Sequence, residues 1–313
     1  LRGTDPTTGA GACLAHACPV RLRFDRGTVL LLDAPADGNF RDLPGVLWDP
    51  RVEALRAPAM LHPVIRAELA RRGVHVADEV ARTADLPGRW TEPTLRPYQD
   101  DALWAWQRAG RRGVVVLPTG AGKTRVALAA MSRAGRPALA LVPTRVLLDQ
   151  WTRELSAVYS GPVGCLGDGQ SRVEAITVST FESAWRHMHE IGDRFQLIVA
   201  DEVHHFGDGR RDEALELCVA PFRLGLTATP PRSPASEQLV ELVGPTVFEL
   251  AVGDLSGRFL APFQLVILRL DLAPGERREW EQAVAAYRPV LRAFQRECPG
   301  ADWLDFARAA SRT

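Results

Sequence analysis

The glycine-rich turn at residues 117–124, Leu-Pro-Thr-Gly-Ala-Gly-Lys-Thr, constrains this chain more than any other stretch. It follows the apolar run Val114–Val116 and opens a helical pattern over Lys123–Arg133. This order predicts a phosphate cradle, because glycines admit an anion close to the backbone amides and a helix N-terminus is positive. Lys123 would reach the terminal phosphates, and Thr124 would place its hydroxyl on Mg²⁺. The other residues expected around the nucleotide phosphates are Thr119, Gly120, Ala121 and Gly122.

Lys123 is the only lysine among 38 basic residues, and Arg occupies every other basic position. An ammonium is a compact point charge that fits between backbone amides and phosphate oxygens, whereas a planar guanidinium is broader. The lysine at this one position therefore favours a role in phosphate binding over the alternative, a lysine that stands in a glycine-rich turn by chance.

The formal net charge of zero excludes a globally basic surface, so any nucleic-acid binding would use a local groove. No apolar run approaches the roughly 18 residues of a membrane helix, and we expect no membrane partner. Five scattered cysteines suit a reducing cytoplasm. Cys13, His16 and Cys18 do not complete a zinc site at a usual spacing.

At 313 residues the chain is long enough for two or three domains. In the first domain, alternating residues predict a hairpin of strands Val20–Phe24 and Thr28–Leu32, followed by a helix over Pro63–Arg72 and a strand at Val74–Val76. The expected parts are a disordered or upstream segment (1–18), a small α+β domain (19–88), an ATP-binding domain (89–272) and a truncated helical insertion (273–313).

Short apolar runs alternate with helical patterns through the middle of the chain. These runs are Val114–Leu117, Ala138–Val142, Ala175–Val178, Leu197–Ala200 and Phe222–Leu226. Strands of this kind predict an α/β fold, a parallel sheet with helices on both faces. In such sheets ligands gather at the carboxyl ends of the strands.

The fourth run ends in Asp201 and Glu202, followed by His204 and His205. After a phosphate loop, a carboxylate at a strand end can hold Mg²⁺, and Glu202 can orient and deprotonate an attacking water. Metal binding by the two histidines is the alternative interpretation, which the spacing after the phosphate loop disfavours. The candidate catalytic residues are Glu202, Lys123 and His204.

Polar residues also end the other runs. Thr144, Arg145, Ser179 and Thr180 could grip the phosphates of a nucleic-acid strand, or the hydroxyls could simply cap helices. Thr227 and Thr229 could link the γ-phosphate to movement elsewhere. Gln99, about twenty residues before the phosphate loop, could bond both the donor and the acceptor edge of an adenine.

Six motifs in this order resemble those of the first motor domain of a superfamily 2 helicase. They are Arg96–Gln99, Pro118–Thr124, Val142–Thr144, Val178–Thr180, Asp201–His205 and Gly225–Thr229. The run Ala220–Thr229 and the later Val247–Leu250 most resemble the xeroderma pigmentosum group B (XPB) helicases. The similarity covers roughly Val20–Leu272.

The resemblance implies a P-loop (RecA-like) fold and ATP-dependent 3′-to-5′ translocation on single-stranded or forked DNA, with duplex opening in repair or transcription. The small N-terminal domain stands where those proteins carry a damage-recognition domain. By position, Arg96 with Gln99 would read the nucleotide, and Asp201 would hold Mg²⁺. His204 with Thr227 and Thr229 would couple hydrolysis to strand movement.

Two departures limit the expected activity. Pro230–Pro234 stands where the family carries an Arg-Glu-Asp element that is thought to help separate DNA strands. We therefore expect translocation more firmly than strand separation. A second motor domain with its arginine finger is missing, so ATP hydrolysis should be weak. The helix after Pro274 resembles the start of the family's thumb insertion. The alternatives are the motor subunit of a restriction or phage-defence system with a nuclease partner, or a non-catalytic module that binds nucleotide and DNA.

Overall fold

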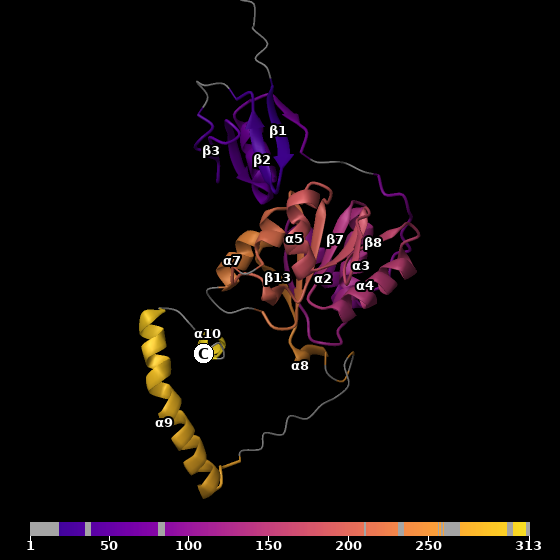
Figure 1. The fold of residues 1–313 in the computed structure, drawn as a ribbon. Coiled ribbons are helices and arrows are strands. Elements are labelled where there is room, and N and C mark those ends of the chain that lie inside the picture. Colours follow the sequence, from indigo (N-terminus) through magenta and orange to yellow (C-terminus); the bar gives the residue numbers. More distant parts are fainter. Residues whose placement is uncertain are drawn as a thin grey trace, which may run out of the picture. The chain divides into compact units, whose positions relative to one another are not determined.

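The computed structural model describes residues 19–34, 39–80, 85–209, 211–230, 235–255, 257, 259, 270–298 and 303–310. The chain divides into two compact units, Leu1–Pro262 and Phe263–Thr313. The first unit contains a five-stranded and an eight-stranded sheet (Figure 1). The segment 1–18 and most of Pro230–Pro234 lie outside the described residues. No helix in these ranges is long and apolar enough to cross a membrane.

The smaller sheet begins with the predicted hairpin. Strands β1 (Val20–Asp25) and β2 (Thr28–Leu32) pair antiparallel across a turn in which Gly27 has a φ of 79°. The remaining elements are β3 (Leu47–Asp49), β4 (Ala54–Pro58), η1 (Ala59–Leu61), α1 (His62–Arg71) and β5 (Val76–Asp78). Helix α1 lies one residue earlier than predicted, and β5 begins two residues later. The strand order is β3-β4-β2-β1-β5.

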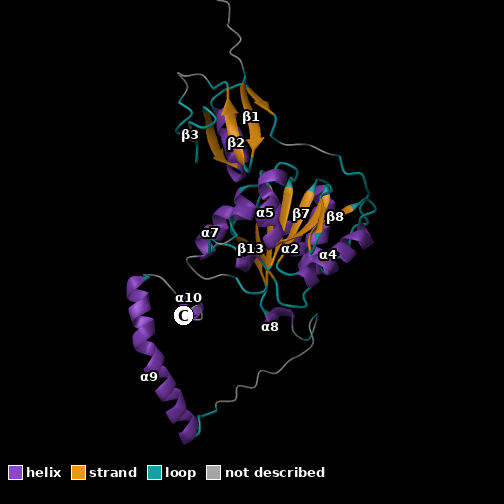
Figure 2. Cartoon of the chain, viewed as in Figure 1, coloured by secondary structure: helices purple, strands orange, loops and turns teal. Residues whose placement is uncertain are grey.

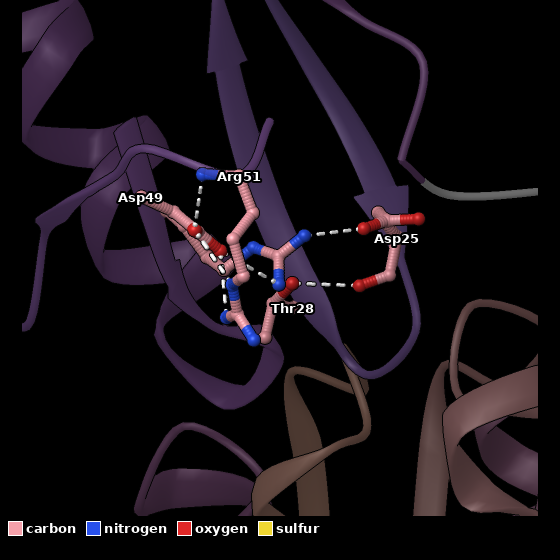
Figure 3. A network of polar contacts seen from close by, with 5 residues as sticks. Asp25, Thr28, Asp49 and Arg51 are labelled. Carbon is pink, nitrogen blue, oxygen red and sulfur yellow. Dashed lines mark hydrogen bonds and ion pairs between the residues drawn. The ribbon is translucent and has the colours of Figure 1, made fainter. Parts of the chain in front are cut away.

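A network of charged side chains joins the hairpin to β3 and β4 (Figure 3). Arg51 donates from Nε and Nη2 to the two carboxylate oxygens of Asp49, at 3.0 and 2.9 Å. Arg56 contacts Asp49 at 3.2 Å and also Asp25, and the Thr28 hydroxyl donates to the Asp25 carbonyl at 2.6 Å. The hydrogen bonds from Arg51 lower the pKa of Asp49 to about 2. The network therefore stays charged at neutral pH.

The larger sheet has the order β13-β6-β12-β11-β7-β10-β8-β9, and its described pairings are parallel except for β8 with β9. Its strands are β6 (Arg112–Val116), β7 (Ala138–Val142), β8 (Val163–Gly167), β9 (Gln170–Arg172), β10 (Ile176–Thr180), β11 (Leu197–Asp201), β12 (Phe222–Thr227) and β13 (Thr246–Glu249). The five predicted strands are present as β6, β7, β10, β11 and β12. The predicted α/β class is confirmed, and the sheet extends beyond the prediction by β8, β9 and β13.

Helices cover both faces of this sheet (Figure 2). The helices of this part of the chain are α2 (Pro97–Arg108), α3 (Lys123–Ala134), α4 (Arg145–Val158), α5 (Phe181–Ile191), η2 (Val203–His205), α6 (Glu213–Glu216), α7 (Ala235–Leu242) and α8 (Val252–Leu255). The side chains of strand β7 point alternately to the two faces of the sheet. Ala140 packs in one core with Trp106 and Val126, whereas Leu139 packs in the other with Met188. Burial on both faces explains why these strands are continuously apolar.

The second unit consists of α9 (Pro274–Glu297) and α10 (Trp303–Ala310). The helix predicted after Pro274 is present as α9. Aromatic rings join the two helices, with Tyr287 5.0 Å from Trp303 and Phe294 5.8 Å from Phe306 between ring centroids.

Candidate nucleotide-binding site

The turn between β6 and α3 has the backbone that a phosphate cradle requires. Gly120 and Gly122 have φ of 80° and 79°, and Gly122 caps the N-terminus of α3. Thr119 and Gly120 are exposed, whereas Ala121 is buried. Lys123 and Thr124 follow in the first turn of α3, beside the open amides of the helix end. The local geometry therefore suits an anion at this edge of the sheet.

Gln99 ties this turn to the start of α2. Its Nε2 donates to the Ala121 carbonyl at 2.7 Å, and its Oε1 accepts from the Arg96 backbone N–H at 2.9 Å. Tyr98 also donates to the Ala121 carbonyl, at 2.9 Å. Both ends of the Gln99 amide are thus used within the chain, which leaves one N–H of Nε2 and one lone pair of Oε1. Recognition of adenine by Gln99 stays a prediction.

A pocket of about 370 Å³ lies against the phosphate loop. Its lining residues are Thr94, Leu95, Arg96, Gln99, Gly120, Ala121, Gly122 and Arg125. The Arg96 guanidinium lies 5.7 Å from the ring centroid of Phe259 and donates to the carbonyl of that residue at 3.2 Å. The two predicted nucleotide-reading residues, Arg96 and Gln99, therefore share one pocket with the phosphate loop.

Asp201 ends β11, and its carboxylate is held at both oxygens. Oδ1 accepts from the Glu202 backbone N–H and Oδ2 from the indole N–H of Trp151, each at 3.0 Å. Burial raises the pKa of this carboxyl group, while the Trp151 hydrogen bond acts in the opposite direction. Sequence reasoning missed Trp151, because it belongs to the apolar stripe of α4 together with Leu148 and Leu155.

Glu202 has a left-handed backbone, with φ 49° and ψ 50°. Such a conformation is strained for a residue with a Cβ, and it is typical of functional sites. The Glu202 carboxylate lies 3.7 Å from Lys123 Nζ and 3.4 Å from His204 Nδ1. Glu202 therefore contacts both other predicted catalytic residues, His204 in the same short segment after β11 and Lys123 at the start of α3.

His204 connects this cluster to the end of β12. The Thr227 hydroxyl donates to the Thr229 carbonyl and accepts from the Thr229 N–H, each at 3.0 Å. Because its one proton is used there, Thr227 Oγ1 accepts from His204 Nδ1, at 2.9 Å. Burial and the neighbouring His205 lower the pKa of His204, which favours the neutral ring. The two predicted coupling threonines thus join one network with His204.

The donor set around the site suits Mg²⁺. The described residues hold no group of three or more His, Cys, Asp or Glu side chains that could hold a metal ion. Mg²⁺ commonly takes one or two protein oxygens and completes its shell with water and phosphate. Thr124 and Asp201 would supply such oxygens, so the residues present fit this ion when nucleotide is bound.

The four predicted nucleic-acid residues differ in accessibility. Thr144 and Arg145 are exposed at the start of α4, where Thr144 Oγ1 accepts from the Leu147 N–H at 3.3 Å and Arg145 pairs with Asp168 at 3.0 Å. Thr180 is also buried, at 8% exposure, and caps α5 through a bond from the Ser183 N–H. Ser179 is fully buried, and its hydroxyl donates to the Thr180 carbonyl. A direct strand contact by Ser179 is therefore disfavoured, and the other three stay predictions.

Two family models match adjoining parts of the chain. Residues 22–80 match the xeroderma pigmentosum group B helicase damage recognition domain, and residues 92–232 match the type III restriction enzyme, res subunit. The first match covers the smaller sheet. The second covers the phosphate loop, Asp201, Glu202 and Thr227.

Curated relatives carry names of the same kind. The DNA 3′-5′ translocase XPB2 of Sulfurisphaera tokodaii is 34% identical over 263 residues, 84% of this chain and 58% of the relative. The DNA 3′-5′ helicase XPB of Mycobacterium tuberculosis is 34% identical over 205 residues, 60% of this chain and 36% of the relative. A putative DNA 3′-5′ helicase Rad25 of Halobacterium salinarum is 42% identical over 159 residues, 48% of this chain and 26% of the relative.

The matches thus span less than two thirds of the length of each of these relatives, from 26% to 58%. The two adjoining matches fall in the order that the family resemblance predicted, with the small domain before the phosphate-loop domain. By its motifs, its fold and these similarities, the chain belongs to the XPB-type family of superfamily 2 helicases.

Proposed function

We propose that this chain is the ATP-binding motor part of an ATP-dependent DNA translocase that moves 3′ to 5′. One observation carries the proposal: the ends of β6, β11 and β12 bring Lys123, Glu202 with His204, and Thr227 into one contact network at the phosphate loop. Such a convergence at the carboxyl edge of a parallel sheet suits phosphoryl transfer, which depends on positioning and charge. The names of the relatives supply the polarity and the DNA substrate.

Each residue has a role in this proposal. Lys123 and the loop amides bind the phosphates, and Thr124 and Asp201 hold Mg²⁺. The ion, when bound, neutralises charge that develops on the transferred phosphoryl group. Glu202 orients the attacking water and takes its proton, and His204 Nδ1 lies between the Glu202 carboxylate, at 3.4 Å, and the Thr227 hydroxyl, at 2.9 Å.

The nucleotide base would occupy the pocket beside Arg96, and the remaining N–H of Gln99 is available to it. Thr144, Arg145 and Thr180 are the proposed contacts with a DNA strand. The exposed Arg145–Asp168 pair contributes little to stability, so a DNA phosphate could replace Asp168 at small cost. We place this activity in the cytoplasm, with association to the nucleoid if the cell is prokaryotic.

The test uses the full chain, with ATP binding measured by anisotropy of a labelled analogue and hydrolysis measured with and without single- and double-stranded DNA. Lys123→Ala should abolish binding, because the loop loses its only ammonium. Glu202→Gln should preserve binding and stop turnover. Binding by Lys123→Ala with the affinity of the unmodified chain would refute the site assignment.

The match to the res subunit of type III restriction enzymes favours one alternative, a motor subunit that acts with a nuclease. DNA cleavage that appears only when a co-purifying protein is present would support this alternative. Nucleotide binding without turnover in any DNA condition would instead support a non-catalytic module.

A further inference from the structure

The carboxylate of Asp201 owes its position to a residue on another element. Trp151 lies in the second turn of α4, is fully buried, and donates its indole N–H to Oδ2 of Asp201 at 3.0 Å. The other oxygen, Oδ1, accepts from the Glu202 N–H. One donor on each oxygen fixes the rotation of the carboxylate about its Cβ–Cγ bond.

The carboxylate needs these donors because it is only 6% exposed. A buried charge is disfavoured unless hydrogen bonds stabilise it, and bonds donated to the oxygens favour the ionised form. Loss of the indole N–H would leave one buried oxygen of Asp201 without that donor. The side chain could then rotate about its Cβ–Cγ bond, and this rotation would misplace an oxygen ligand.

We infer that Trp151 is a positioning residue that holds Asp201 in the orientation needed for Mg²⁺. This inference rests on the proposed function, because it assumes that Asp201 serves Mg²⁺ with bound nucleotide. A purely structural role is the competing interpretation, since the ring also fills the apolar stripe between Leu148 and Leu155.

The chain contains a matched control for that interpretation. Trp106 in α2 is also buried, at 1% exposure, and donates its indole N–H to the Arg223 carbonyl at 2.9 Å. Trp106→Phe and Trp151→Phe therefore each remove one buried indole hydrogen bond and keep an aromatic ring. They differ in the acceptor, which is a backbone carbonyl for Trp106 and the Asp201 carboxylate for Trp151.

The experiment measures binding of an ATP analogue with a fluorescent ribose label to the full chain, first in EDTA and then over a Mg²⁺ titration. Anisotropy of the label is the readout, because it does not depend on tryptophan emission. In Trp151→Phe, the affinity in EDTA should stay within about twofold. The Mg²⁺ concentration for half-maximal effect should rise about tenfold to a hundredfold, as is typical when the partner of a metal ligand is removed.

Trp106→Phe should change neither the affinity for the ATP analogue in EDTA nor the Mg²⁺ concentration for half-maximal effect. Trp151→Leu, which keeps an apolar side chain in the stripe and also lacks the N–H, is a second variant and should shift the Mg²⁺ requirement as Trp151→Phe does. An unchanged Mg²⁺ requirement, or an equal loss of affinity with and without Mg²⁺, would overturn the inference while the proposed function stands. Absence of nucleotide binding by the unmodified chain would overturn both.

Discussion

Replacing Gly122 by alanine should separate the phosphate loop from helix α2. A Cβ at this position would lie 2.5 Å from Nε2 of Gln99. Gln99 is 2% exposed and bonded at both ends of its amide, so its side chain cannot move without breaking those bonds. Gly122 also has a φ of 79° and a ψ of 43°, a left-handed conformation that favours glycine. Alanine at position 122 is therefore disfavoured both by the left-handed backbone conformation and by the steric clash with Gln99.

The magnitude can be worked out from these two costs. The left-handed backbone costs about 1 kcal/mol for a residue with a Cβ. Displacing the Gln99 amide breaks two hydrogen bonds, each contributing about 1 kcal/mol to stability. The free energy of unfolding should therefore fall by about 3 kcal/mol in Gly122→Ala.

Gly135 provides the matched control at the other end of α3. It is also left-handed, with a φ of 56°, but a Cβ there would meet no heavy atom within 4 Å. Gly135→Ala should therefore cost only the backbone term of about 1 kcal/mol. The loss of unfolded-state entropy is common to both alanine variants and cancels in the comparison.

Urea unfolding followed by circular dichroism would measure both variants in the full chain. The two should differ by about 2 kcal/mol, and Gly122→Ala should also weaken binding of a labelled ATP analogue. In a Gln99→Ala background, where the clashing amide is gone, Gly122→Ala should cost only about 1 kcal/mol. Equal destabilisation by the two glycine replacements, or strict additivity in the double variant, would refute the reasoning.

Two further predictions concern charge. Lys123→Arg should lose binding of labelled ATP even though the positive charge remains. The reason is that the Lys123 side chain is only 11% exposed and lies 3.7 Å from Glu202, so a broader guanidinium does not fit. An unchanged affinity for labelled ATP would contradict the requirement for a compact ammonium. Asp49 has a folded-state pKa of about 2 against an ordinary 3.8, so the stability from its ionised form is present above about pH 4 and is lost as the pH falls toward 2. Denaturant unfolding at pH 6 and pH 3 should show a larger loss for the unmodified chain than for Asp49→Asn, and parallel losses would argue against the Arg51 contact.

Much of the larger sheet could be predicted because its central strands are uninterrupted apolar runs with helical patterns between them. Strand β8 lacked that signal, since it contains Gly164 and Gly167. A Cβ on Gly164 would lie 2.5 Å from Oγ1 of Thr177 on the neighbouring strand β10. The glycine that permits this close approach also lowers the strand propensity of the segment. Packing, rather than local pattern, decides this strand.

The surroundings of Asp201 could not be predicted for a different reason. The apolar spacing of Leu148, Trp151 and Leu155 predicts only that all three side chains of α4 are buried. A buried indole N–H needs an acceptor, but its identity depends on which element packs against the helix. Trp106 finds a backbone carbonyl, whereas Trp151 finds a carboxylate at a strand end fifty positions away. The functional difference between two similar tryptophans therefore arises from the tertiary fold, and the acceptor atom distinguishes a positioning residue from a packing residue.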